Sequence, residues 1–241
     1  MKLFTNKKKL RKEIGKINNI SFVPTMGFLH KGHESIIKKS VKGSGKTLVS
    51  IFINPKQFNS RKDLKSYPRN SKNDIKILKK LKIDYLYKPS YADIYKFKTK
   101  NKIYLDKFAK ELCGEFRKGH FKGVIDVVNR LLEITNPKRI FLGNKDFQQL
   151  YLIQKHIMKN KIKTKVFPCK TIRDKNFIAY SSRLTRLNHN EKIKLIKIIK
   201  VLKKYKNDLI LKKQIYNFSK IKKKIISMGA KNVDYIKLID L

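Results

Sequence analysis

Two histidines, His30 and His33, stand three positions apart around Gly32 and follow directly on an apolar run. Residues 20–23 have the composition of a short buried strand, and residues 34–41 have the apolar spacing of a helix. Both imidazoles are therefore predicted to lie at a strand-to-helix turn. A helix N-terminus offers N–H groups and partial positive charge, and imidazoles add donors to an anion whose charge grows during reaction. The spacing indicates a site for the phosphates of a nucleotide, with proton transfer as a secondary role.

These histidines do not predict a structural metal. The chain has two cysteines, Cys113 and Cys169, and they stand isolated in the sequence. Structural zinc sites use ligands paired at short spacings, which this chain does not offer. We interpret both cysteines as unreactive core thiols of a protein in a reducing compartment. Protein side chains are thus expected to form no metal site.

Length and composition favour a globular protein. A chain of 241 residues with 41% hydrophobic content can bury one good core, with a small second domain at its end. The first ten residues are rich in lysine and no apolar segment follows them. No later stretch approaches the roughly 20 apolar residues that span a bilayer. We expect a cytoplasmic protein with no membrane association.

The formal net charge of +44 raises the question of nucleic-acid binding. The basic residues are 52 lysines and nine arginines, and the lysines are spread along the whole chain. Lysine, isoleucine and asparagine are abundant together, which indicates compositional drift on exposed positions. We expect only non-specific binding of RNA at low salt. Arg117, Arg173 and Arg183 are more informative, because a guanidinium grips an anion with two hydrogen bonds.

The apolar pattern alternates between strands and helices, which predicts an α/β fold with a doubly wound parallel sheet. Ligands of such sheets bind beyond the carboxyl ends of the strands, where the strand order reverses. The expected strands are residues 20–23, 47–54, 83–87, 139–142 and 163–167, and the expected helices are residues 34–41, 74–81, 124–134 and 146–158.

Polar segments follow several of these strands and are expected at one edge of the sheet. They are residues 54–58, 117–120, 143–149 and 181–183. Their lysine, arginine, hydroxyl and imidazole groups can neutralise a triphosphate. Asp146 can accept a hydrogen bond from a ribose hydroxyl, and Gln57 and Gln149 can orient a small polar acid. The set supplies what adenylation of an acid requires.

This ordered set of motifs resembles the pantothenate synthetase family, the pantoate:β-alanine ligases of the HxGH nucleotidyltransferase superfamily. The resemblance covers most of the chain, at residues 24–33, 50–58, 67–69, 117–124, 143–149, 181–183 and 229–235. It implies a Rossmann-like fold and a reaction of two steps. Pantoate attacks the α-phosphorus of ATP to give pantoyl adenylate and pyrophosphate, and β-alanine then displaces AMP. It also implies Mg²⁺ bound through the phosphates of ATP, and a homodimer.

The resemblance further implies roles for individual residues. The phosphates are served by His30, His33, Lys145, Ser181, Ser182 and Arg183. The rest of ATP is contacted by Met26, Gly143, Asp146, Ile172 and Tyr180, of which Met26 also lines pantoate. Pantoate is bound by Gln57, Gln149, Val124, Val127 and Val128. The cavity is completed by Asn54, Arg117 and His120.

Two domains are expected from the resemblance. Residues 1–178 would form the domain that binds nucleotide and pantoate. Residues 179–241 would form a small α+β lid domain, shortened at Leu241 within what resembles a strand. A shortened lid is expected to retain ATP less well and to lower stability.

Several residues depart from the family pattern: Phe28, Asp126, Asn144, Phe177 and Leu184. They keep two alternatives open. One is a related adenylyl-transfer enzyme whose acid or acceptor has changed. The other is a decayed fold retained as a basic protein that binds nucleic acid. The intact histidines and the intact serine and arginine motif argue against decay, because drift would have eroded an idle site.

Overall fold

The computed structural model describes residues 1–211 and 216–239, and the chain divides into two compact units. The first unit is Met1–Ile172 and the second is Arg173–Leu241. The domain boundary expected after residue 178 falls inside the second unit. The two units are described separately below.

The first unit contains a six-stranded sheet in the order β1-β4-β3-β2-β5-β6, and every neighbouring pair is parallel. From β2 the chain adds β3 and β4 on one side, and it then returns to the other side for β5 and β6. The order therefore reverses between β2 and β5, which confirms the predicted doubly wound fold. The strands are β1 (Lys2–Phe4), β2 (Ile20–Thr25), β3 (Lys46–Ile51), β4 (Tyr85–Tyr87), β5 (Arg139–Gly143) and β6 (Lys165–Cys169).

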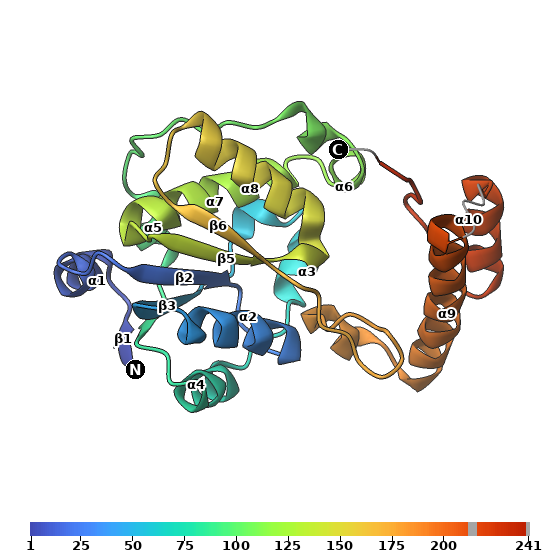
Figure 1. Ribbon diagram of the computed structural model, residues 1–241, viewed down its shortest axis with the longest axis horizontal. Coiled ribbons are helices and arrows are strands. Elements are labelled where there is room, and N and C mark those ends of the chain that lie inside the picture. The colour runs from blue at the N-terminus through green and yellow to red at the C-terminus, as the bar shows by residue number, and fades with distance from the viewer. Residues whose placement is uncertain (212–215, 240–241) are drawn as a thin grey trace. The chain divides into compact units, whose positions relative to one another are not determined.

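Helices cover both faces of this sheet. Figure 1 shows α2 and α4 on one side, and α5, α7 and α8 on the other. The α-helices are α1 (Lys7–Ile14), α2 (Lys31–Lys42), α3 (Arg61–Lys65), α4 (Ser71–Lys80), α5 (Tyr91–Tyr95), α6 (Cys113–Phe116), α7 (His120–Thr135) and α8 (Phe147–Lys159). Short 3-10 helices are η1 (Pro55–Gln57), η2 (Lys107–Lys110) and η3 (Asn144–Asp146).

Strand β3 ends at Ile51, three positions before the predicted end. The pairing explains the difference, because Thr25 at the end of β2 is opposite Ile51 and Tyr87 at the end of β4 is opposite Ser50. No neighbour extends further, so the ladder stops although the sequence remains apolar. The three residues of β1 form an edge strand against β4, which was not predicted.

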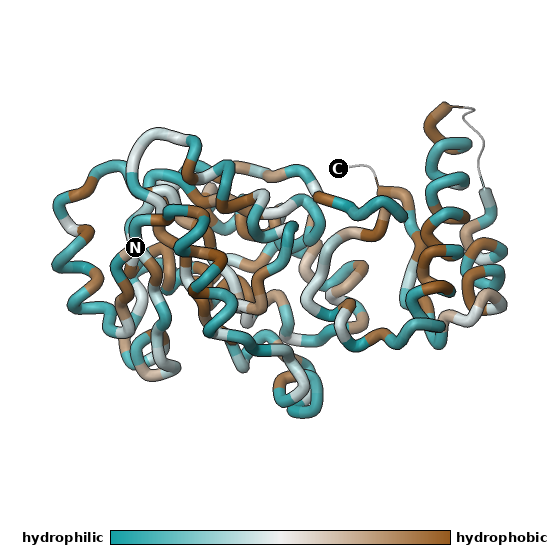
Figure 2. Tube along the Cα trace, turned by 90° about the horizontal axis from the view of Figure 1, so that it is seen from below, coloured by the Kyte–Doolittle hydropathy of each residue, from teal (hydrophilic) through white to brown (hydrophobic). Residues whose placement is uncertain are grey.

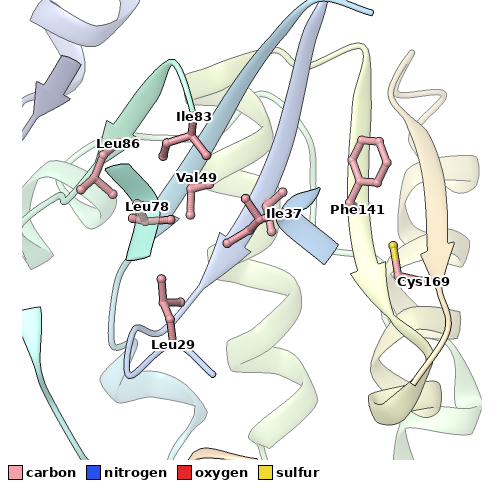
Figure 3. Close-up of a cluster of buried hydrophobic side chains, with 9 residues drawn as sticks. Leu29, Ile37, Val49, Leu78, Ile83, Leu86, Phe141 and Cys169 are labelled. Carbon is pink, nitrogen blue, oxygen red and sulfur yellow. The ribbon is translucent and has the colours of Figure 1, made fainter. Parts of the chain in front are cut away.

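The core on the α2 side of the sheet is a cluster of nine buried side chains. They come from strands β2 to β6, from α2 and α4, from the turn after β2 and, for Ile83, from the segment before β4, as Figure 3 shows for eight of them. Leu29 anchors that turn in the core, because its side chain packs here with Ile37 of α2 and Leu78 of α4. Cys169 also lies in this cluster, where burial raises the pKa of its thiol.

A buried polar network joins α7 and α8 on the other side. His156 is fully buried, and its Nδ1 accepts the N–H of Tyr104 at 3.2 Å. Because Nδ1 accepts, Nε2 carries the proton and donates to Asn129 Oδ1 at 3.1 Å. Burial lowers the pKa of His156, so its ring is neutral near pH 7.

The second unit contains η4 (Ser182–Arg186), α9 (His189–Leu211) and α10 (Phe218–Ser227). Its own small core is formed by Ile198, Ile221 and Ile225. One isolated antiparallel bridge joins Arg173 to Ala179. Residues 238 and 239 of the segment expected to be a strand form none, and residues 240 and 241 lie outside the described part of the chain.

Polarity follows burial along the chain. In Figure 2 hydrophobic residues gather inside the first unit and hydrophilic residues colour most of its outer turns. Across residues 1–211 and 216–239, the structure has no helix with both the length and the apolar character needed to cross a bilayer. The burial of individual residues agrees with Figure 2, since the lysines lie mainly at exposed positions.

Candidate active site

The turn between β2 and α2 has an unusual backbone that is held by a distant carboxylate. Gly27 and Phe28 are both left-handed, with φ of 78° and 51°. The carboxylate of Asp74, at the start of α4, accepts the N–H of Phe28 at 2.9 Å and of Leu29 at 2.7 Å. Thr25 Oγ1 accepts the N–H of Gly27 at 3.2 Å. These bonds fix the backbone that leads into the two histidines.

The first histidine caps α2. Nδ1 of His30 accepts the N–H of Gly32 at 3.2 Å, so in the neutral ring Nε2 carries the proton. The ring of His33 lies one helical turn along, with its centroid 4.0 Å from that of His30. Nδ1 of His33 is buried and has no hydrogen-bond partner within the described residues. A buried polar atom seldom lacks a partner, which favours a functional over a structural role for this ring.

Both imidazoles are neutral near pH 7. Burial and, to a lesser extent, the positive charge of Lys145 together lower the pKa of His30 to about 4, while Asp146 opposes the shift. Burial, with smaller contributions from His30 and Lys145, lowers the pKa of His33 to about 3. The rings therefore act at this pH as neutral hydrogen-bonding groups rather than as cations.

The loop after β5 lies against α2. A Cβ added at Gly143 would stand 3.3 Å from Cδ1 of Ile36, so the end of β5 packs closely on this helix. The next residues form η3, where Lys145 Nζ pairs with Asp146 Oδ1 at 3.3 Å. Because β2 and β5 are neighbours where the strand order reverses, His30 and Lys145 share one edge of the sheet.

The loop after β3 reaches the same edge. Nε2 of Gln57 lies 2.9 Å from the sulfur of Met26, at the end of β2. Asn54, 1% exposed, donates to Gln57 Oε1 at 3.3 Å and to the carbonyl of Gly123 at 3.0 Å. A Cβ at Gly123 would lie 2.2 Å from the carbonyl oxygen of Lys56, so only glycine allows α7 to approach this loop.

The start of α7 supplies further predicted residues. Nδ1 of His120 lies 2.6 Å from the backbone oxygen of Gln57. The preceding Gly119 is left-handed with φ of 77°, and Arg117 is half-buried. Three valines for which the family resemblance implies contact with pantoate are buried on the first turns of α7: Val124, Val127 and Val128.

Two adjacent glutamines at the start of α8 have different surroundings. Gln149, the predicted ligand, is half-buried. Gln148 is buried, and its Nε2 donates to the carbonyls of Phe108 at 2.7 Å and Glu111 at 2.8 Å. The sequence analysis did not single out Gln148. Its role is to hold the segment around η2 against α8.

Ile172, the expected neighbour of adenine, lines a groove of about 600 Å³ along α2. Lys39 Nζ donates to the carbonyl of Pro168 at 3.0 Å, which joins α2 to β6. The remaining lining residues are Lys31, Glu34, Ser35, Lys38, Lys39 and Lys42. The groove is therefore positively charged and suits a ligand that carries phosphate.

The other predicted phosphate ligands belong to the second unit. Ser181 caps η4, where its Oγ accepts the N–H of Arg183 at 3.3 Å. Ser182 is buried, Arg183 is exposed and Tyr180 is half-buried. The turn before them is held by Asp174, whose Oδ1 accepts the N–H of Ile178 at 2.9 Å.

A sequence model described as Pantoate-beta-alanine ligase matches residues 2–241 of this chain. The chain belongs to the pantoate-beta-alanine ligase family. Members of this family carry out the ATP-dependent synthesis of pantothenate, and the resemblance seen in the sequence is confirmed.

Individual relatives agree with this family. The chain is 46% identical over 177 residues to a pantothenate synthetase of Flavobacterium psychrophilum, a match that covers 73% of this chain and 63% of the relative. It is 38% identical over 246 residues to that of Endomicrobium trichonymphae, which covers 100% of this chain and 86% of the relative. A crystal structure of the pantoate-beta-alanine ligase from Francisella tularensis, complexed with beta-gamma ATP and beta-alanine, matches with a TM-score of 0.89 and 36% identity. That match covers 100% of this chain and 90% of the other.

The five residues that depart from the pattern implied by the resemblance have different surroundings in the structure. Phe28 and Phe177 both have positive φ, at 51° and 64°, and Phe177 stands where the resemblance implies glycine. Asp126 pairs with Arg130 at 2.7 Å, so its carboxylate is neutralised inside the protein. Asn144 is exposed on η3, and Leu184 is half-buried on η4.

Proposed function

We propose that this ligase joins pantoate to β-alanine through a pantoyl-adenylate intermediate. The observation that carries the proposal is the pair of neutral imidazoles at the N-terminus of α2, beside the loop of Lys145. The related enzyme of Francisella tularensis was crystallised with beta-gamma ATP and beta-alanine, which supports the same substrates here. The carboxylate of pantoate attacks the α-phosphorus, and pyrophosphate leaves.

Positioning and charge are the proposed contributions of the first unit to this step. As the α-phosphate gains negative charge, His30 and His33 donate hydrogen bonds to it, and Lys145 adds a full positive charge. Neutral donors at a helix N-terminus are already desolvated, so they need little rearrangement during reaction. Gly143 and Asp146 would contact the ribose, and the backbone at Ile172 would contact adenine.

We assign Ser181, Ser182 and Arg183 to the β- and γ-phosphates, and Tyr180 to the base. These assignments follow the family resemblance and the chemistry of the residues. Hydroxyl groups and a guanidinium fork are good donors to phosphate oxygens. Residues 179–241 would thus act on the nucleotide, while residues 1–178 bind nucleotide and pantoate.

Pantoate would be held by amides and by an apolar wall. Gln57 and Gln149 would bond its hydroxyls and carboxylate, while Met26 and three valines of α7 would contact its dimethyl-bearing carbon: Val124, Val127 and Val128. Asn54, Arg117 and His120 would complete the cavity. The adenylate is then consumed when the amine of β-alanine attacks its carbonyl carbon and AMP leaves. No acyl-enzyme nucleophile is required.

The side chains present do not fit a magnesium ion held by the protein. Within residues 1–211 and 216–239, no three His, Cys, Asp or Glu side chains come together as ligands. The Asp146 carboxylate already pairs with Lys145. Mg²⁺ is therefore proposed to arrive on the phosphate oxygens of ATP, and no step is assigned to it. A homodimer and a cytoplasmic location are further proposals.

Exchange of labelled pyrophosphate into ATP tests the first step. Purified protein with Mg²⁺ should exchange only when pantoate is present, and adding β-alanine should yield AMP and pantothenate in equal amounts. A folded protein that binds ATP yet shows no exchange with pantoate would contradict the proposal. Exchange with another acid would then identify a changed substrate.

A further inference from the structure

A buried hydrogen-bond network lies directly behind Gln57, with Asn54 at its centre. Oδ1 of Asn54 accepts the N–H of Lys56 at 3.2 Å and the hydroxyl of Tyr95 at 2.8 Å. Nδ2 donates to the carbonyl of Gly123 at 3.0 Å and to Oε1 of Gln57 at 3.3 Å. Oδ1 and Nδ2 of Asn54 thus make two hydrogen bonds each.

These partners fix the orientation of both amides. A backbone carbonyl can only accept, and a backbone N–H can only donate, so Gly123 and Lys56 determine which atom of Asn54 is oxygen. The atom of Gln57 that faces Nδ2 must then be its oxygen. Nε2 of Gln57 is left as a donor, next to the sulfur of Met26 at 2.9 Å. Because thioether sulfur is a weak acceptor, this N–H₂ group can exchange it for an oxygen of a ligand at little cost.

The hydroxyl of Tyr95 is held in place by charges around its ring. Nζ of Lys56 lies 4.0 Å from the ring centroid, and the guanidinium of Arg130 lies 4.9 Å from it. Both cations pair with Asp126, at 3.4 Å and 2.7 Å. Asp126 is a departure from the family pattern, and here its carboxylate holds the two cations that flank the tyrosine.

Burial raises the pKa of Tyr95, so the phenol remains a neutral donor throughout the physiological range. The hydroxyl therefore always presents a proton to Asn54 Oδ1. Without it, Asn54 would keep only the Lys56 N–H at this oxygen, and its amide could tilt away from Gln57.

We propose that Tyr95 is a positioning residue for pantoate, acting through Asn54 to hold the Gln57 amide with its N–H₂ group toward the substrate. The ligand atom selected there is an acceptor, either a carboxylate or a hydroxyl oxygen. The proposal rests on the assignment of Gln57 to pantoate given above. Tyr95 itself touches no reacting atom.

Steady-state kinetics of Tyr95→Phe test this role. Loss of one hydrogen bond in the relay should raise KM for pantoate by about 3- to 10-fold. KM for ATP should change less than about twofold, since no atom of this relay serves the nucleotide. Tyr87→Phe is the matched control, because it removes another buried tyrosine hydroxyl whose partner is Asp93 rather than Asn54. An unchanged KM for pantoate in Tyr95→Phe, or an equal rise for both substrates, would overturn the proposal.

A double-mutant cycle separates the relay from a general loss of structure. In a Gln57→Ala background, adding Tyr95→Phe should leave KM for pantoate unchanged, because the amide it positions is gone. The same fold-increase in both backgrounds would show that Tyr95 acts by another route and would overturn the inference alone. If Gln57→Ala itself leaves KM unchanged, the assignment of Gln57 to pantoate fails as well. KM does not depend on the amount of active enzyme, so a partly unfolded variant still gives a decisive result.

Discussion

Lys145 and the two histidines are electrostatically linked, and this link gives a testable expectation for a single residue. Burial is the main cause of the lowered pKa of both rings, and the positive charge of Lys145 lowers each pKa as well. In Lys145→Ala, turnover should fall by about 10²-fold or more, because the full positive charge proposed to stabilise the α-phosphate is lost. The exposed Lys223 on α10 is the control, and Lys223→Ala should keep the wild-type kcat. A rate for Lys145→Ala near that of the wild type would refute the phosphate assignment.

Phe177 gives a second expectation for a single residue. Its φ of 64° lies in the left-handed region, and 47% of the side chain is exposed. Alanine is strained at such a position, so Phe177→Gly should be more stable than Phe177→Ala by about 1 kcal/mol in urea unfolding. At an exposed site with negative φ the order reverses, because glycine loses more backbone entropy. Alanine as the more stable variant would therefore contradict the backbone described here.

At the scale of elements, a pair of hydrogen bonds joins α4 to the turn before α2. Asp74 is 2% exposed, and its carboxylate is the acceptor for two backbone N–H groups of that turn. Asp74→Ala would leave both donors without a partner and should lower the free energy of unfolding by roughly 3 kcal/mol. It should also lower kcat, because the turn sets the backbone that leads to His30.

Lys76→Ala on the exposed face of α4 is the control for Asp74→Ala. It should change the urea midpoint very little. Asp74→Asn keeps the shape of the side chain but places an N–H₂ group against one backbone donor, so it should be destabilising too. Wild-type stability in both Asp74 variants would show that the turn keeps its conformation without the Asp74 carboxylate.

At the scale of the whole molecule, the buried histidines link folding to pH. In the folded chain the pKa is about 4 for His30 and about 3 for His33, and it is lowered for His156, against an ordinary value of 6.5. The unfolded chain therefore binds more protons, and stability falls as pH decreases from about 6.5 toward 4. The urea midpoint of unfolding should therefore decrease as the pH is lowered from 7.5 to 4.5. His33→Asn should flatten the decline, whereas the exposed His189→Asn should not.

The net charge of +44 gives a second expectation at this scale. A diffuse lysine surface binds RNA through counterion release, so affinity should fall by about tenfold or more between 50 and 200 mM salt. Sequence preference should be absent, and His30→Ala should bind RNA as the wild type does. A preference for one RNA sequence that survives high salt would show that the lysine surface reads more than phosphate. Filter binding over a salt series measures both.

The local sequence determined much of the first unit. The strand at residues 20–23 and the helices at residues 34–41 and 124–134 were predicted, and the structure contains them within the longer elements β2, α2 and α7. They could be predicted because the apolar periodicity of one element lies in that element's own residues. The chemistry of the turn between β2 and α2 was likewise visible in its glycines and histidines. The positive φ of Phe28 was not predicted, because nothing in the local sequence favours a left-handed backbone at an aromatic residue.

Only the tertiary structure decided which of these pieces meet. The order of strands places β2 between β3 and β5, and so sets His30 beside the loops of Gln57 and Lys145. Asp74 braces a turn 46 positions away, and Tyr95 bonds an asparagine 41 positions away. A buried carboxylate or hydroxyl acquires its role from a partner that the fold brings to it. Spacing along the chain carries no record of that partner, which is why these two residues emerged only from the folded protein.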